Sequence, residues 1–473
     1  MNRLIEMRPG EQNPPIFHCK INNERIMEKI VIIGGDAAGM TAASKIRRTD
    51  KKCKITVFEK GEHTSYAACG IPYFVAGYVD KKRHLIARTP EEFAEKQRIR
   101  VNIRHEAIKI DRERKEVEVI DLKTKKSLRI PYDKLLIATG ASPVVPHVDG
   151  IKAKGVFTVS NLTDAQRIHH FIQKQKPKKA VVVGGGYIGL EMAEALLERD
   201  AAVSLIDMSP QVMNTMDEDM AGVIQKYMKK EGVKLYLNEG LKKIEKNEKG
   251  EAIAVVTDKH TLQADLVILG IGIKPNSGLA KDAGLKLGEK EAILVDKTMR
   301  TSDEFIWAAG DCATSYHLVK EKPVSIALGT VANKHGLIAG TNMSGADEEF
   351  PGVIGTAITK FKAMEIARTG LSEKEAAELN IPVKTTVITS KTKAGYYPGS
   401  EEITVKLVAE ESSLRLLGGQ IVGFAGSGKR IDTLAAAITA KLTARDLAFM
   451  DLSYAPPFSP VWDPVQIAAR QLI

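Results

Sequence analysis

Residues 30–46, IVIIGGDAAGMTAASKI, decide the fold of this chain, and residues 181–197, VVVGGGYIGLEMAEALL, repeat the same pattern. Each segment opens with a short apolar run, passes through a glycine-rich turn and continues in small and apolar residues. This order predicts a buried strand, a tight turn and a helix. Glycines in such a turn let the backbone approach a pyrophosphate, which then lies at the helix N-terminus. Two copies therefore predict two dinucleotide-binding folds of the α/β class.

Each motif is followed by a second apolar strand that ends in an acid, Glu59 after the first turn and Asp207 after the second. A carboxylate at this distance can accept hydrogen bonds from a ribose diol. The second turn carries all three glycines of the pattern, Gly184, Gly186 and Gly189.

The first turn departs from the pattern at one position. Gly34 and Gly39 are present, but Asp36 stands at the middle position, which weakens the prediction of close phosphate approach there. In the second copy, Asp207 is followed by Met208-Ser209-Pro210, with no arginine to bind a 2′-phosphate. This favours NADH over NADPH, although a cation from elsewhere in the fold would admit NADPH.

Further segments belong with these two folds. The apolar runs 135–140 and 266–272 both end at glycine, and Asp311 directly follows the apolar run 306–309. Asp311 either caps a following helix or binds the sugar chain of a cofactor. From residue 350 the pattern changes to alternating strands, at 383–389, 403–408 and 414–422, with a helix at 432–448. These predict a separate α+β domain with an antiparallel sheet.

Cys69 lies in the segment Ser65–Tyr73, SYAACGIPY, thirty-five positions after Gly34. A helix that begins at residues 70–72 would direct its N-terminal amides at the sulfur, which predicts a lowered pKa and a stabilised thiolate. The alternative is a small buried apolar residue. The glycine-rich loops on either side favour a redox function.

Composition excludes several classes of protein. The chain has 473 residues and a net charge of +10, but its lysines and arginines are interleaved with glutamates, so no nucleic-acid surface is expected. The four cysteines show no spacing typical of a metal site or a disulfide framework, which favours a reducing cytoplasm. No apolar run is long enough to span a membrane. Residues 1–26 are predicted to be a polar, disordered leader, and Cys19 within them is given no role.

Together these motifs resemble the flavoprotein disulfide reductases over residues 27–473. The resemblance implies an FAD domain at 27–150 and 276–346, an NAD(P) domain at 151–275 and a C-terminal dimerisation domain at 350–473. It implies FAD contacts from Gly34, Asp36, Ala37, Gly39, Glu59, Lys60, Ala107, Thr139, Gly140 and Asp311. It implies NADH or NADPH contacts from Gly184, Gly186, Tyr187, Ile188, Gly189, Asp207 and Gly272. Tyr187 resembles the tyrosine that covers the flavin until nicotinamide displaces it.

The cysteine pattern points to one branch of that family. Relatives of glutathione reductase use two cysteines and a C-terminal histidine, whereas this chain has Thr64 five positions before Cys69 and no histidine after His335. It resembles the single-cysteine branch, which contains coenzyme A disulfide reductases, NADH oxidases and NADH peroxidases. Oxidases and peroxidases of this branch carry a histidine where this chain has Ala37. The resemblance therefore favours a coenzyme A disulfide reductase.

In coenzyme A disulfide reductases, tyrosines from the partner subunit approach the thiol. The resemblance implies this role for Tyr396 and Tyr454, with Tyr397 in place of Tyr396 as a second possible alignment. The alternative is that these tyrosines have a structural role only and pack in the core of the dimer interface. Coenzyme A contacts are implied for Lys45, Arg48, Ser65, Tyr397, Lys429 and Arg430. The family often has asparagine before the cysteine, where this chain has Ala68, and this departure predicts looser binding of coenzyme A or a wider pocket.

The expected protein is a homodimer, with further pairing of dimers left open, that acts on a small disulfide or persulfide. Alternatives remain open at this point. One is an NADH oxidase or peroxidase that cycles Cys69 through a sulfenic acid, and another is a sulfur reductase. From a different class, an electron-transfer reductase for a small iron protein or a flavin redox sensor would share the same folds.

Overall fold

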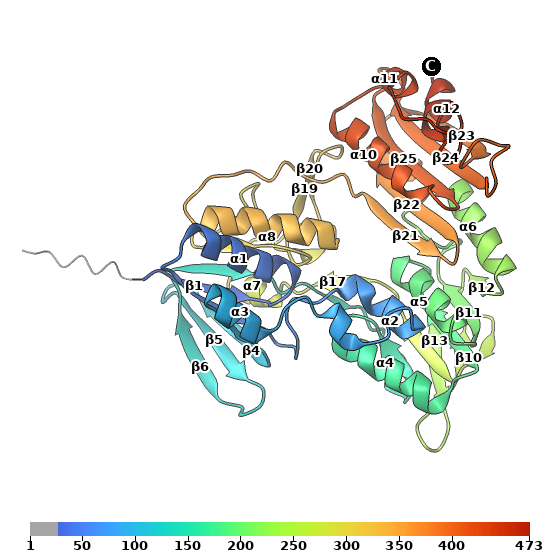
Figure 1. The fold of residues 1–473 in the computed structure, drawn as a ribbon. Coiled ribbons are helices and arrows are strands. Elements are labelled where there is room, and N and C mark those ends of the chain that lie inside the picture. The colour runs from blue at the N-terminus through green and yellow to red at the C-terminus, as the bar shows by residue number, and fades with distance from the viewer. Residues whose placement is uncertain (1–26) are drawn as a thin grey trace, which may run out of the picture.

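A computed structural model describes residues 27–473, which form three units (Figure 1). The predicted leader and Cys19 lie outside the described residues. Two units contain five-stranded parallel sheets, and the third contains a five-stranded antiparallel sheet. The α/β prediction with a C-terminal α+β unit is confirmed. Within the described residues, no helix is long and apolar enough to cross a membrane.

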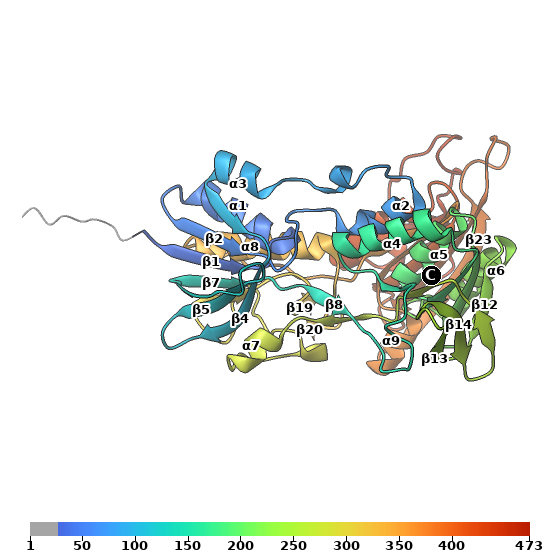
Figure 2. The same ribbon diagram turned by 90° about the horizontal axis from the view of Figure 1, so that it is seen from below.

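The first unit gathers strands from distant parts of the chain into the order β18-β7-β1-β2-β3. Its strands are β1 (Lys29–Ile33), β2 (Lys54–Phe58), β3 (Ile99–Asn102), β7 (Lys134–Ile137) and β18 (Ile306–Ala308). Helices α1 (Ala37–Thr49) and α8 (Gly329–Met343) lie side by side on one face, and a three-stranded sheet lies on the other (Figures 1 and 2). That sheet contains β4 (His105–Asp111), β5 (Glu116–Asp121) and β6 (Ser127–Pro131). Because both faces are covered, the central strands β1 and β7 are apolar and buried at every position after their first residue.

The second unit repeats this plan with the order β12-β11-β10-β16-β9. Its strands are β9 (Val156–Thr158), β10 (Lys179–Val183), β11 (Ala202–Asp207), β12 (Lys234–Leu237) and β16 (Leu266–Leu269). It also holds α4 (Leu162–Gln175), α5 (Tyr187–Leu197), α6 (Glu218–Lys230), β13 (Leu241–Lys246), β14 (Ala252–Thr257) and β15 (Thr261–Gln263). Ala180 and Val182 of β10 pack in the helix-side core, whereas Val181 and Val183 pack in the core with β13–β15. This alternation follows from the two-residue period of a strand.

The third unit confirms the predicted strands and adds two that precede them. Its strands are β21 (Ala357–Phe361), β22 (Met364–Gly370), β23 (Val383–Lys391), β24 (Glu402–Glu410) and β25 (Leu416–Gly423). Its helices are α9 (Glu373–Glu378), α10 (Ile431–Thr439), α11 (Ala444–Ala448) and α12 (Pro464–Arg470). The prediction of one helix over 432–448 is wrong. Lys441 has a left-handed φ of 57°, and Thr443 starts α11 with a capping box to Asp446.

Shorter elements complete the units and the connections between them. They are α2 (Ile71–Ala76), α3 (Pro90–Gln97), α7 (Gly278–Asp282), β8 (Ala141–Pro143), β17 (Ile273–Pro275), β19 (Ser315–His317) and β20 (Lys322–Val324). The two passages of the chain between the first and second units pair as β8 and β17. We retain the predicted domain boundaries as a proposal.

Buried ion pairs fasten the third unit to the second. The side chain of Lys406 is 4% exposed, and its Nζ lies 3.3 Å from Asp217, 2.9 Å from Asp219 and 2.8 Å from Glu373. Nearby, Glu375 accepts hydrogen bonds from Arg368 at 2.6 Å and from Lys320 of the first unit at 2.9 Å. Since Asp217 and Asp219 belong to the segment around the start of α6, these contacts limit movement of the second unit relative to the third.

Candidate active site

The first glycine turn has no room for side chains at its key positions. Gly34 has φ 109°, and a Cβ there would lie 2.0 Å from the Ala138 carbonyl oxygen. A Cβ on Gly39 would lie 1.9 Å from the oxygen of Gly34. The Gly35 amide donates to the Glu59 carboxylate at 2.7 Å. The turn therefore packs strand, helix and acid as tightly as a dinucleotide site requires.

The second turn has the same construction. A Cβ on Gly184 would lie 2.4 Å from the Gly270 oxygen, and one on Gly189 would lie 1.9 Å from the Gly184 oxygen. A Cβ on Gly186 would meet nothing within 4 Å, so this position faces open space. Asp207 accepts from the Gly185 amide at 2.6 Å and from the Ser209 amide at 2.7 Å. Each carboxylate oxygen keeps a lone pair for a ribose hydroxyl. The residues of both turns fit a bound dinucleotide.

The loop that leads to Cys69 is attached to the first turn. The Thr64 hydroxyl and the Ser65 amide both donate to the Gly35 carbonyl, the second at 3.0 Å. The Tyr66 amide donates to Asp36 Oδ1 at 3.0 Å. Ser65 has a left-handed φ of 49°, which turns the chain between these contacts. A dinucleotide at the turn is thereby coupled through backbone contacts to the thiol segment.

Helix α2 joins this loop to the second unit. It begins at Ile71, directly after a 3₁₀ turn at Ala68–Gly70 that contains Cys69, as the sequence predicts. It packs against α4 and α5 (Figure 2), and Arg199, just beyond α5, donates to the Val75 carbonyl at 2.7 Å. Because α5 starts at Tyr187 of the second turn, the thiol lies between the two dinucleotide sites.

Cys69 is the accessible thiol of the described chain. Of the three cysteines within residues 27–473, all are free; Cys69 is exposed, whereas Cys53 and Cys312 are buried. The alternative of a buried structural cysteine is therefore wrong for Cys69, and a protein disulfide with either of the others is absent among the described residues.

The sequence predicts a lowered pKa for Cys69, and this prediction is wrong: the surrounding protein groups raise the pKa. Partial enclosure of the sulfur raises the pKa of the thiol, and the charges of Glu191, Asp311 and Asp36 raise it further. A hydrogen bond from the backbone of Cys69 itself lowers the pKa but is the smallest of these effects. Helix α2 begins where the sequence indicates, but burial of the sulfur and carboxylates from three separate segments raise the pKa of the thiol.

Those carboxylates are themselves held toward the neutral form. Burial raises the pKa of Asp311 and of Glu191, and raises that of Asp36 to about 6. Thr359 donates to Glu191 at 2.8 Å. The capping alternative for Asp311 is wrong, because the next described helix starts only at Gly329. Sequence reasoning missed Glu191, which lies one helical turn after Tyr187 and was assigned to the apolar helix pattern.

The other predicted cofactor residues surround the two turns. Thr139 and Gly140 are fastened by Asn276, whose side-chain amide donates to the Thr139 oxygen at 2.8 Å and whose backbone amide donates to the Gly140 oxygen at 2.9 Å. Lys60 pairs with Glu106 at 2.7 Å and is exposed. Ala37 and Ile188 lie in the first turns of helices α1 and α5, Ala107 lies in β4, and Gly272 has φ 115°.

The Tyr187 hydroxyl is buried without a hydrogen-bond partner in the described chain, which suits a ring that moves when a ligand binds.

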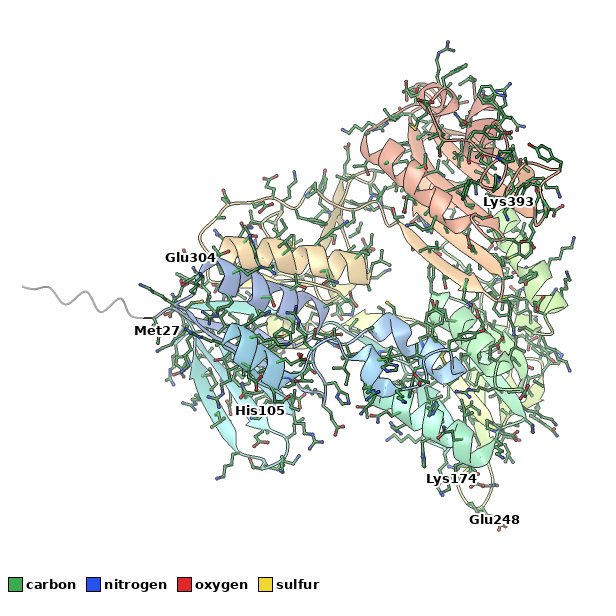
Figure 3. All side chains as sticks on the ribbon, in the orientation of Figure 1. Met27, His105, Lys174, Glu248, Glu304 and Lys393 are labelled. Atoms are coloured by element: carbon green, nitrogen blue, oxygen red, sulfur yellow. The ribbon has the colours of Figure 1, made fainter. Side chains whose placement is uncertain are left out.

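The predicted tyrosines lie together on the third unit. Tyr396, Tyr397 and Tyr454 are exposed, and Tyr454 shares a hydrogen bond with Tyr396 that raises the Tyr454 pKa. Lys393, at the start of the Tyr396 loop, lies away from α2 of the same chain (Figure 3). One chain therefore does not bring these tyrosines to its own Cys69.

The structure gives Arg430 a different role from the predicted contact with a substrate phosphate. Its guanidinium donates to Asp463 at 2.8 Å, to the Thr392 oxygen at 3.1 Å and to the Phe458 oxygen at 2.8 Å, and also bonds the Gly426 oxygen. These bonds tie the Tyr396 loop to the Tyr454 loop and leave little capacity for a ligand.

The neighbouring cations differ from Arg430. Lys429 is exposed and pairs with Asp432. Lys45 is half-buried and Arg48 exposed on α1, which leaves both available to an anion.

Comparison with known proteins agrees with this geometry. The family profile "Pyridine nucleotide-disulphide oxidoreductase" matches residues 28–336, and the dimerisation-domain profile of the same family matches residues 356–464. This chain belongs to that family. It is 42% identical to the NAD(P)H coenzyme A polysulfide/persulfide reductase of Pyrococcus horikoshii, over 95% of this chain and 99% of that protein.

Two further relatives support the same assignment. The chain is 35% identical to a coenzyme A disulfide reductase of Staphylococcus aureus, over 92% of this chain and 97% of that protein. A solved NAD-dependent persulfide reductase from A. fulgidus matches with a TM-score of 0.91 and 41% identity, over 94% of this chain and 82% of that one.

Proposed function

We propose that this protein uses bound FAD and NADH or NADPH to reduce coenzyme A disulfide, or a coenzyme A persulfide, at Cys69. The observation that carries the proposal is an exposed thiol between two dinucleotide turns, with no exposed cysteine partner in the described chain. An unpaired protein thiol requires that the second sulfur come from a small molecule. The relatives named for coenzyme A chemistry, which match over nearly their whole length, support that choice.

In this proposal the chain's residues bind and orient. The first turn, with Glu59 and Asp311, holds FAD, and the second turn, with Asp207, holds the nicotinamide dinucleotide. The chemistry that FAD supplies when bound is the transfer of two electrons from nicotinamide to sulfur. Lys45, Arg48 and Ser65 would bind the anionic substrate close to α1 and the Cys69 loop, with Lys429 as a further cation.

The bond changes at Cys69 follow from thiol chemistry. The Cys69 thiolate attacks one sulfur of coenzyme A disulfide, which forms a Cys69–coenzyme A disulfide and releases one coenzyme A thiolate. Tyr454 or Tyr396 of the partner subunit supplies a proton to the leaving sulfur. Two electrons then cleave the mixed disulfide, release the second coenzyme A and restore the Cys69 thiolate.

The dimer is part of this proposal. The third unit matches the family's dimerisation domain, and its exposed face carries Tyr454, Phe458 and Trp462 at exposures of 45%, 76% and 42%. Aromatic side chains of this kind are enriched at the centres of interfaces. A homodimer would bring these loops to the partner's Cys69. Pairing of dimers into a tetramer remains a separate proposal without a surface assigned to it.

The first experiment replaces the thiol. Cys69→Ser should keep bound FAD and its spectrum but lose reduction of coenzyme A disulfide. Cys53→Ser is the matched control, because its hydroxyl can keep the contacts of Cys53 with Arg47 and the Asp50 oxygen. Wild-type turnover in Cys69→Ser would refute the proposal and favour an electron-transfer reductase that does not need the thiol.

The second experiment identifies the resting state of the thiol. Mass spectrometry of the full chain, purified without reductant, should show a coenzyme A adduct on the peptide that carries Cys69. A sulfenic acid on that peptide would instead favour an NADH oxidase or peroxidase. Binding of NADH without steady consumption would favour a redox sensor.

A further inference from the structure

Asp36 occupies an unusual position for an acid. It lies between β1 and α1, where a dinucleotide's pyrophosphate approaches the helix N-terminus, and its side chain does not cap that helix. Its Oδ1 accepts the Tyr66 amide at 3.0 Å. No hydrogen bond of normal geometry reaches its Oδ2 among the described residues, although the adjacent Ala37 amide favours the charged carboxylate. One oxygen is therefore committed to the Cys69 loop, and the other is free beside the turn.

The surroundings of Asp36 are acidic. Glu59 at the end of β2 and Asp311 after β18 both act on it, whereas the Tyr66 and Ala37 amides favour its charged form. Burial is the largest effect and brings the Asp36 pKa to about 6. The two negative charges of a pyrophosphate would act in the same direction, because like charges favour the neutral acid. An ionised Asp36 and a bound pyrophosphate are thus poorly compatible.

We propose that Asp36 binds the flavin dinucleotide as a neutral acid: one oxygen accepts the Tyr66 amide, and the other donates its proton to the pyrophosphate. This inference rests on the proposed function, in which the first turn holds FAD. It explains how an acid can replace the middle glycine of the turn. It also removes the Asp36 charge, which is one of the three carboxylate charges that raise the Cys69 pKa.

The proposal has a defined pH dependence. Below the pKa of free Asp36 the acid is neutral with and without FAD, and the affinity does not change with pH. Above it, the free protein must take up a proton to bind FAD, so the Kd rises by up to about tenfold per pH unit. Asp311, whose pKa is also raised by burial, adds its own dependence, whereas burial moves the pKa of Tyr66 upward, further from neutrality.

The test measures FAD released on dilution of the holoenzyme, by flavin fluorescence from pH 5.5 to 8.5. Wild type should release FAD more readily as pH rises. Asp36→Asn should keep the Tyr66 contact, flatten the profile and bind FAD about tenfold or more tightly than wild type at pH 8. Asp311→Asn is the comparison variant: it removes the pH dependence of Asp311 itself, and the slope caused by Asp36 should persist but move to lower pH, because Asp311 no longer raises the Asp36 pKa.

A second readout uses the thiol. In the holoenzyme, the pH profile of Cys69 alkylation by iodoacetamide should be the same in wild type and Asp36→Asn, because Asp36 is already neutral. A shifted profile, or equal pH dependence of FAD release in the two proteins, would overturn the proposal. If Asp36→Asn fails to fold, the pH profile of FAD release from the other two proteins decides. A flat profile in wild type overturns the proposal, and a slope that is present in wild type and persists in Asp311→Asn supports it. Wild type that binds no FAD at any pH would instead refute the proposed function.

Discussion

Gly186→Ala separates ligand binding from folding in the second turn. Gly186 has φ −81° and ψ −169°, an extended conformation that alanine adopts without strain, and its new Cβ would meet nothing within 4 Å. The unfolded chain loses conformational freedom, so the free energy of unfolding should stay constant or rise by about 0.4–1 kcal/mol. The added methyl group occupies the space through which the backbone approaches a pyrophosphate.

The expected cost therefore appears in binding. A loss of about 1.4–3 kcal/mol on the dinucleotide corresponds to a rise in the KM for NADH of about tenfold to 150-fold. Gly189→Ala is the contrasting control. Its Cβ would lie 1.9 Å from the Gly184 oxygen, which forces the helix away from the strand at a cost of about 1–3 kcal/mol or more.

The assay combines thermal melting with flavin reduction at varied NADH concentration. Gly186→Ala should melt at or above the wild-type temperature with a raised KM, and Gly189→Ala should melt several degrees lower. An unchanged KM in Gly186→Ala would refute the assignment of this turn to the nicotinamide dinucleotide. Melting of Gly186→Ala at the Gly189→Ala temperature would refute the geometry of the turn.

Three other perturbations test the third unit. Arg430→Ala should lower kcat without loss of bound FAD, measured by steady-state kinetics and absorbance, because the Tyr454 loop loses its anchor. Lys406→Met should lower the unfolding free energy by about 3–5 kcal/mol in denaturant titrations, because it leaves Asp217 buried and unpaired. Burial raises the pKa of Glu375, but the neighbouring Arg368 and the other groups that bond the carboxylate together outweigh burial and hold this pKa at about 2. The free energy of unfolding of wild type should therefore fall by about 3 kcal/mol as the pH falls from 4.5 toward 2. Glu375→Gln should be less stable at pH 7 and lack this part of the acid loss.

Local patterns predicted the parts of the site that depend on neighbouring residues. The glycine turns, the acids at Glu59 and Asp207 and the helix start after Cys69 appear at the predicted positions. Each is marked in the sequence by residue types at fixed spacing, although the contacts that require them include distant partners such as Ala138 beside Gly34.

Predictions that depended on distant residues were the ones that failed. Arg430 resembles a free surface cation in sequence, but loops on either side of it in the fold use its donors. The apparent helix over 432–448 has continuous apolar spacing, yet Leu416 and Leu442 pair across the break and Thr443 starts a new helix.

The amino-acid sequence alone determined that this protein has two dinucleotide turns and one thiol beside them, because the order of strand, glycine turn and helix is visible in short stretches of residue types. The tertiary structure decided the chemistry of that thiol. Enclosure of the sulfur raises its pKa most, and to this is added the sum of the charges on Glu191, Asp311 and Asp36, which come from three segments that only folding brings together. Coulomb interactions act through space rather than along the chain, so the sign of that sum could not be obtained before the distances were known.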